Sequence, residues 1–169
     1  MIALNNILVA TDFGEASDAA LRYGRELAQK FDATLHVLHV AENVAIATLG
    51  AETFAAVAPE LQQEIEAGAL KTLKEVLTDS DHSGPVTRPV VLTSSSPAYA
   101  IVDYAHDHDI SLIVMGTNGR GAIEHFLMGS VAERVVRLAG CPVLTVRHQE
   151  RDFVRPDALA VTAHTGVTA

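Results

Sequence analysis

The chain has 169 residues, of which 49% are hydrophobic, so it is long enough to form one domain with a buried core. Its formal net charge is -9, from 12 Lys and Arg against 21 Asp and Glu. The resulting field repels nucleic-acid phosphates and anionic lipid heads, so we expect no nucleic-acid partner.

The cysteine count and the apolar runs bear on the compartment. Cys141 is the single cysteine, so no internal disulfide can form and a reducing compartment is favoured. Residues 1–6 lack the basic start and apolar core of a secretory signal, and no apolar run approaches the ~20 residues that span a bilayer. We therefore expect a cytoplasmic protein with no membrane insertion.

Strand and helix patterns alternate in the first half of the chain. Residues 7–10 and 34–40 are apolar runs typical of parallel strands covered on both faces. Between them an apolar stripe from Ser17 to Phe31 predicts a helix, with Ser17 as its N-cap. Residues 41–58 are small and without a clear period, and we interpret them as a flexible, partly helical excursion. Pro59 then begins a helix that ends at about Thr78.

The alternation continues after a turn at 79–85. Residues 86–92 predict a third strand, and Ser96 and Pro97 cap and open a helix that closes over 106–109. Residues 112–115 predict the fourth strand.

A glycine-rich loop follows, from Gly116 to Ser130, and the last predicted elements are a helix over 130–139 and a strand over 143–146. The strand and helix order predicts an α/β fold with right-handed crossovers and a mostly parallel sheet. We assign residues 1–148 to this domain and 149–169 to a flexible C-terminal tail.

The glycine-rich loop is the main candidate site. In an open parallel sheet, ligands bind beyond the carboxyl ends of the strands, where the winding reverses. Asp12 and Gly116 follow the first and fourth strands, and glycines let backbone N–H groups approach phosphate oxygens closely. Asp12 could instead merely cap its own turn.

The end of the loop predicts an anion site. Ser130 and Glu133 have the spacing of a capping box, so the helix would begin at Ser130 and its first N–H groups would face the loop. Arg120 is the one cation within the loop, and it could make a bidentate contact with a phosphate.

The spacing Gly116-x-x-Gly119, nine residues, Gly129-Ser130 resembles the nucleotide-binding signature of the ATP-binding universal stress proteins. Four further segments match the same family in the same order, and they are residues 7–12, 112–117, 129–135 and 141–147. The resemblance covers about residues 1–148, with an interruption at 41–58. Asn118 departs from it, since many members carry His there, but Asn is polar and tolerates left-handed backbone.

The resemblance implies a five-stranded sheet of order 3-2-1-4-5 with helices on both faces, a Rossmann-like architecture of the adenine nucleotide alpha hydrolase type. It also implies a homodimer through the fifth strand, Val143–Val146, and a bound adenine nucleotide, which is ATP, ADP or AMP, with or without Mg²⁺.

Carried over residue by residue, the resemblance assigns the ribose side to Thr11 and Asp12, and adenine to Val40; we add Ala10, beside them on the first strand, to the cofactor-binding residues. Met115 and Gly116 would line the nucleoside pocket, and the phosphates would contact Gly119, Gly129, Ser130 and Val131, with Arg120 as the added cation of the loop.

Two function classes remain open from the sequence. The first is a stress-response or regulatory module whose nucleotide state tunes its stability or its binding to an unknown protein partner. The second is a slow ATPase or phosphotransfer enzyme, but the chain has no GxxxxGK[ST] loop and no carboxylate placed as a base. An FMN carrier is disfavoured because Trp is absent and Phe13 and Tyr99 are poorly placed to flank a flavin.

Other reactive side chains predict no further site. His36 and His39 would lie on opposite faces of a strand, and His106 and His108 are two apart at a helix end, so neither pair has chelating spacing. Cys141 has no charged activator beside it in the sequence, and we expect it to be a buried small residue rather than a nucleophile.

Overall fold

The computed structural model describes residues 2–44, 58–78, 84–117 and 128–147. The five strands are β1 (Asn6–Thr11), β2 (Thr34–Ala41), β3 (Thr87–Thr93), β4 (Leu112–Gly116) and β5 (Val143–Val146). The helices are α1 (Glu15–Phe31), α3 (Ala58–Thr78), α4 (Pro97–Asp107) and α5 (Ser130–Leu138). These elements confirm the predicted order. The expected tail and most of the excursion over 41–58 and of the turn over 79–85 lie outside the described residues.

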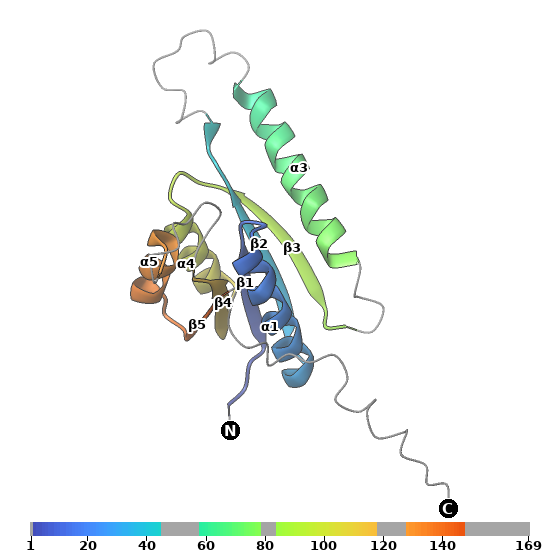
Figure 1. The fold of residues 1–169 in the computed structure, drawn as a ribbon, viewed down its shortest axis with the longest axis vertical. Helices are drawn as coiled ribbons and strands as arrows, with labels where there is room; N and C mark the ends of the chain where they lie inside the picture. The colour runs from blue at the N-terminus through green and yellow to red at the C-terminus, as the bar shows by residue number, and fades with distance from the viewer. Residues whose placement is uncertain (1, 45–57, 79–83, 118–127, 148–169) are drawn as a thin grey trace, which may run out of the picture.

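The five strands form one sheet of order β3-β2-β1-β4-β5, and every neighbouring pair is parallel (Figure 1). The predicted fold class is therefore confirmed. The chain adds β2 and β3 on one side of β1 and then crosses to add β4 and β5 on the other side. The winding reverses between β1 and β4, which is where ligands bind in sheets of this kind.

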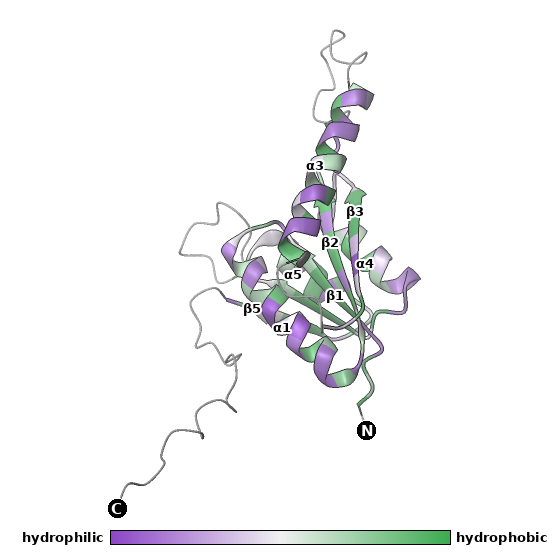
Figure 2. Ribbon diagram, turned by 90° about the vertical axis from the view of Figure 1, so that its right-hand side faces the viewer, coloured by the Kyte–Doolittle hydropathy of each residue, from purple (hydrophilic) through white to green (hydrophobic). Residues whose placement is uncertain are grey.

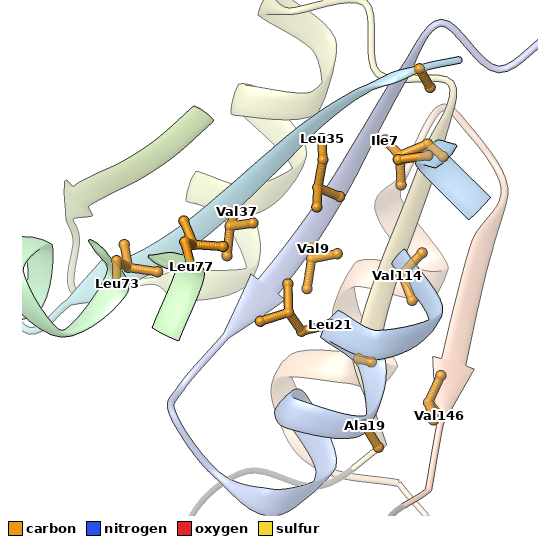
Figure 3. Close-up of a cluster of buried hydrophobic side chains, with 13 residues drawn as sticks. Ile7, Val9, Ala19, Leu21, Leu35, Val37, Leu73, Leu77, Val114 and Val146 are labelled. Atoms are coloured by element: carbon orange, nitrogen blue, oxygen red, sulfur yellow. The ribbon is translucent and has the colours of Figure 1, made fainter. Parts of the chain in front are cut away.

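Helices cover both faces of the sheet, and the strands supply side chains to both. Ile7 and Val9 of β1 face the first core cluster, which also contains buried residues of α1 and α3 (Figure 3). Leu8 and Ala10 point the other way, into the second core cluster beneath α4 and α5. Figure 2 shows apolar strands between helices of mixed polarity. This two-sided burial explains why the strands read as continuous apolar runs.

The start of α1 differs from the prediction. The helix begins at Glu15 with Gly14 as its N-cap, so the prediction that Ser17 caps it is wrong. Ser17 is instead 3% exposed, and its Oγ accepts a hydrogen bond from Gly14 N at 3.0 Å and donates one to Gly14 O at 2.8 Å. Its hydroxyl therefore closes the first turn from inside, where tertiary packing buries it.

The start of α4 agrees with the prediction in position. Ser96 is the N-cap and Pro97 opens the helix, but the Ser96 side chain makes no capping bond. The Ser96 carbonyl accepts hydrogen bonds from Tyr99 N at 3.1 Å and Ala100 N at 3.2 Å.

A buried histidine lies between β2 and α4. His36 is 2% exposed, and its Nδ1 lies 2.8 Å from the hydroxyl of Tyr104. Burial raises the pKa of Tyr104, so its hydroxyl keeps its proton and can donate to Nδ1 in the tautomer of His36 that carries its proton on Nε2. The His108 ring lies 4.0 Å from the Tyr104 ring and 5.9 Å from the His36 ring, centroid to centroid.

The surroundings of His36 keep it neutral. Burial is the largest cause that lowers its pKa from 6.5, and the nearby charges of Arg88 and His108 lower it further. Its Nε2 is buried and has no hydrogen-bond partner in the described part of the chain, so a proton added to the ring would bring an uncompensated charge.

We expect acid to weaken the fold through His36. The unfolded chain binds the imidazole proton below pH 6.5 and the folded chain resists it, so stability is full above that pH and falls as the pH drops below it. Each unit by which the folded pKa is lowered contributes about 1.4 kcal/mol. Urea unfolding of the wild type and of the His36→Leu/Tyr104→Phe double variant at pH 7.5 and pH 5.5 measures this effect.

The double variant removes both hydrogen-bonding groups, so neither partner is left unpaired, and it should lose most of the pH dependence. His106→Gln is the matched control because His106 is an exposed histidine on α4, the helix that carries Tyr104. Its stability should depend on pH as that of the wild type does. An equal pH dependence in all three proteins would contradict this role for His36.

Candidate functional site

Ligands bind at the carboxyl ends of the central strands in sheets of this kind, and we call this region the crevice. The loop after β1 is one wall of it, and hydrogen bonds tie this loop to α1 and β2. Thr11 Oγ1 donates to Ser17 Oγ at 3.1 Å and accepts from Phe13 N at 3.0 Å. His39 Nδ1 donates to the Thr11 carbonyl at 2.9 Å, and the His39 ring stacks on Phe13 with the centroids 4.4 Å apart. Phe13 has a φ of 61°, an uncommon left-handed conformation that these contacts hold in place.

Asp12 takes part in the same loop. One of its carboxylate oxygens, Oδ1, accepts a hydrogen bond from Gly14 N at 3.1 Å. The capping role that the sequence left open is therefore present, in the form of an Asx turn before α1. A carboxylate oxygen can accept more than one hydrogen bond, so this contact is compatible with a second role at the crevice.

The end of β4 forms the opposite wall and lies against α1 without an intervening side chain. Ala10 of β1 pairs with Met115 of β4, which brings the ends of the two strands together. A Cβ added to Gly116 would lie 2.8 Å from Cβ of Ala16 and 2.9 Å from its carbonyl carbon. Gly116 is thus required for packing, whatever else it does.

Helix α5 begins at Ser130, as predicted, but its N-cap differs from the prediction. Gly129, in extended conformation, is the N-cap and Ser130 is the first helical residue, so the predicted capping box of Ser130 and Glu133 is wrong. The Glu133 carboxylate is drawn instead to Arg137, one turn further on, at 2.7 Å. Gly129 needs no side chain to begin the helix because its extended backbone already does so.

The first turn of α5 presents backbone donors to the crevice. The first bond within the helix runs from Glu133 N to Gly129 O at 2.9 Å. The N–H groups of Ser130, Val131 and Ala132 precede it, so no helical carbonyl is available to them. Together with the positive end of the helix dipole, they favour an anion at this position.

Thr117 joins the end of β4 to α5 and β5. Its N–H donates to the Val146 carbonyl at 2.9 Å, and its carbonyl accepts from Gly129 N at 2.6 Å. The side chain is 5% exposed, and Oγ1 has no hydrogen-bond partner among the residues that the structure describes. Sequence reasoning missed this residue, and its only local signal is a polar side chain directly after a buried strand.

The predicted site residues fall into three groups. Ala10 and Met115 are buried in the second core cluster, with Val40 and Val131 partly buried against it. The residues at the crevice itself are Thr11, Asp12, Gly116, Gly129 and Ser130. Gly119 and Arg120 lie outside the described residues. Sequence reasoning also missed Ser17 and His39, whose roles depend on contacts with the β1 loop.

Cys141 is half-buried and packs against the second core cluster. Burial raises the pKa of its thiol, which opposes formation of the reactive thiolate. This environment agrees with the expected packing role. Within the described residues, no group of three or more His, Cys, Asp or Glu could hold a metal ion, and no helix is long and apolar enough to cross a membrane.

Comparison with known proteins identifies relatives over most of the chain. Residues 3–147 match the family model described as the universal stress protein family. A universal stress protein of Methanocaldococcus jannaschii is 33% identical over 146 residues, which cover 86% of this chain and 84% of that protein. The universal stress protein YxiE of Bacillus subtilis is 32% identical over 148 residues, which cover 85% of this chain and 99% of that protein.

Solved structures show the same fold. Universal stress protein UspA from Lactobacillus plantarum aligns with a TM-score of 0.72 and 28% identity, over 87% of this chain and all of that one (100%). A universal stress protein in complex with cAMP aligns with a TM-score of 0.60 and 22% identity, over 87% of this chain and 99% of that one. The universal stress protein from Archaeoglobus fulgidus in complex with dAMP aligns with a TM-score of 0.53 and 22% identity, over 86% of this chain and 99% of that one.

The contact between β4 and α1 predicts a large cost for a small substitution. Gly116→Ala places a methyl group against the Ala16 backbone, which cannot rotate away, so we expect a loss of about 1–3 kcal/mol in unfolding free energy. Gly68→Ala is the control, because a Cβ there meets nothing within 4 Å and the change should stabilise α3 by up to about 1 kcal/mol. Urea denaturation of both variants tests this, and equal stabilities would argue against the close contact.

Proposed function

The chain belongs to the universal stress protein family, and from this premise we propose that it binds an adenine nucleotide, with ATP as the first candidate, at the carboxyl ends of β1 and β4. The observation that carries the proposal is the first turn of α5, whose N–H groups have no carbonyl partner within the helix, together with the buried Thr117 hydroxyl at the end of β4, where the sheet winding reverses. An anionic group fits there. Because the net charge of -9 repels an anionic ligand at long range, such a ligand must be held by local donors of this kind.

In this proposal, each wall contacts a different part of the nucleotide. The phosphates bind the backbone of Gly129, Ser130 and Val131 at the start of α5. Thr11 and Asp12 lie on the ribose side, and Val40 at the end of β2 contacts adenine. Ala10, Met115 and Gly116 contribute mainly backbone, since the first two side chains are buried and the third is absent.

Three further parts of the proposal rest on the sequence and on the resemblance to the family. Gly119 and Arg120 would complete the phosphate contacts from the loop before α5. Mg²⁺ would accompany the phosphate oxygens, and ADP or AMP could replace ATP.

Family relatives support an adenine nucleotide in particular. Universal stress proteins of the same fold have been solved in complex with cAMP and with dAMP, and both ligands combine adenine, a sugar and a phosphate. We propose that the nucleotide acts here as a regulatory ligand in the cytoplasm, and that its presence tunes stability or binding to a protein partner. The lone Cys141, with its raised thiol pKa, suits a reducing cytoplasmic setting.

ATP should stabilise the protein by mass action, by about 2.7 kcal/mol at a hundredfold excess over the dissociation constant. Ser130→Ala should leave the stability of the nucleotide-free protein nearly unchanged, because Ser130 is not the N-cap, and should reduce the gain from ATP. Thermal melts with and without ATP measure both quantities.

Ser111→Ala is the matched control for this experiment. Ser111 precedes β4 at its opposite end, where Oγ accepts a hydrogen bond from Asn5 N at 3.2 Å. This variant should lose a little stability without ATP and keep the full gain with ATP. A wild type that no adenine nucleotide stabilises would contradict the proposed function, and a full gain in Ser130→Ala would remove Ser130 from the site.

We also propose a homodimer through β5, which is an edge strand of the sheet. The carbonyls of Pro142 and Val146 accept hydrogen bonds from the β4 side, at 3.0 Å from Ile113 N and 2.9 Å from Thr117 N. Backbone groups alternate along a strand, so the N–H and carbonyl of Thr145 point away from the sheet. An apolar edge with such open groups favours pairing with a second copy about a two-fold axis.

Thr145→Pro should convert the dimer to a monomer, because proline removes the outward N–H and leaves the bonds to β4 in place. Thr145→Val keeps the N–H and should remain dimeric. This pair is a cleaner test than a charge at Leu144, whose side chain packs against the first core cluster. Sedimentation measures the result, and a monomeric wild type or a dimeric proline variant would contradict the β5 interface.

A further inference from the structure

Thr117 carries a buried polar group that the fold itself does not use. Its side chain is 5% exposed, and its Oγ1 has neither solvent contact nor a hydrogen-bond partner in the described part of the chain. Burying a hydroxyl without a partner costs free energy, and most buried polar groups in native proteins are paired. The N–H and the carbonyl of Thr117 itself are both hydrogen-bonded, so among the described residues only its side-chain hydroxyl is left without a partner.

The position of Thr117 places its side chain on the face of the sheet that α4 and α5 cover, beside the N-cap of α5. Gly116 faces α1, since a Cβ there would meet Ala16, and consecutive residues of an extended chain alternate between faces. The Thr117 side chain therefore lies on the face of Met115, which α4 and α5 cover. The 2.6 Å hydrogen bond from Gly129 N to the Thr117 carbonyl holds the residue beside the N-cap of α5.

We propose that Thr117 is a ligand-contacting residue, whose hydroxyl donates a hydrogen bond to a phosphate oxygen of the nucleotide at the start of α5. The inference rests on the proposed function and adds a side-chain donor to the backbone donors of that site. A phosphate oxygen is a charged acceptor, so this bond is stronger than one between neutral groups. Its formation satisfies a hydroxyl that has no partner among the described residues.

This role predicts that removing the hydroxyl does not lower the melting temperature but does lower the affinity for the nucleotide. Thr117→Val has nearly the same shape and lacks the hydroxyl. Without nucleotide, the substitution removes an unpaired polar group, so the protein should melt at the same or a higher temperature. With nucleotide, it removes a bond to the phosphate, so affinity should fall. If the hydroxyl had only a structural role, its removal in Thr117→Val would lower the melting temperature of the nucleotide-free protein.

The experiment compares ATP and adenosine binding by calorimetry in the wild type, Thr117→Val and Thr117→Ser. Thr117→Val should bind ATP about tenfold more weakly or worse, the usual range for losing a hydrogen bond to a charged group. Its affinity for adenosine, which has no phosphate, should not change. Thr117→Ser keeps the hydroxyl and should bind ATP as the wild type does.

Thr87→Val is the matched control, since Thr87 lies at the opposite end of the strands and its Oγ1 donates to the Pro85 carbonyl at 3.0 Å. It should melt at a lower temperature and bind ATP normally. Wild-type ATP affinity in Thr117→Val would overturn the inference and leave the proposed function intact. Equal losses of ATP and adenosine binding, or a lower melting temperature without ligand, would assign Thr117 a structural role. A wild type that binds neither compound would instead refute the proposed function.

Discussion

The close approach of α1 to the end of β4 is the constraint on which the site depends. At Gly116 no side chain separates the strand from the first turn of the helix, and a Cβ would lie 2.8 Å from that of Ala16. The loop that connects β1 to α1 is consequently held beside the segment that leaves β4. The sheet winding reverses between these two strands, and ligands bind beyond the strand ends at such a point in sheets of this kind.

The two walls of this crevice differ in how far their polar groups are already paired. On the β1 side, Thr11, Ser17 and His39 form a network that is complete without a ligand. On the α5 side, three backbone N–H groups and the Thr117 hydroxyl have no partner within the helix or the described residues. Helix N-terminal N–H groups favour an anion, and the buried Thr117 hydroxyl gains from any acceptor because it has no partner among the described residues. The α5 wall is therefore where a bound anion would gain most of its free energy.

The order and type of the elements could be predicted from the sequence because burial on both faces of a parallel sheet gives each strand a short apolar run. The strand order followed from resemblance to a family, since periodicity says nothing about which strands are neighbours. Two of the three helix caps that the sequence assigned to serine, at Ser17 and Ser130, belong instead to Gly14 and Gly129.

These errors have a physical reason. Serine and glycine differ by only a few tenths of a kcal/mol at an N-cap, so packing around Ser17 and at Gly116 decides where each helix begins. The hydrogen bond from His39 to Thr11 and the burial of Thr117 depend on contacts between distant segments and carry no local signal.

Thr117 also connects the proposed nucleotide site to the edge of the sheet. Its N–H donates to the Val146 carbonyl, its carbonyl accepts from Gly129 N at the start of α5, and its side chain is buried. A ligand that fixes the Thr117 hydroxyl would thus restrain the end of β5 through a single residue, without any large movement. If β5 pairs with a second copy, linkage requires that pairing changes nucleotide affinity by the same factor by which the nucleotide changes pairing. A module of this size could then report the presence of a nucleotide through its own assembly, with no catalytic step.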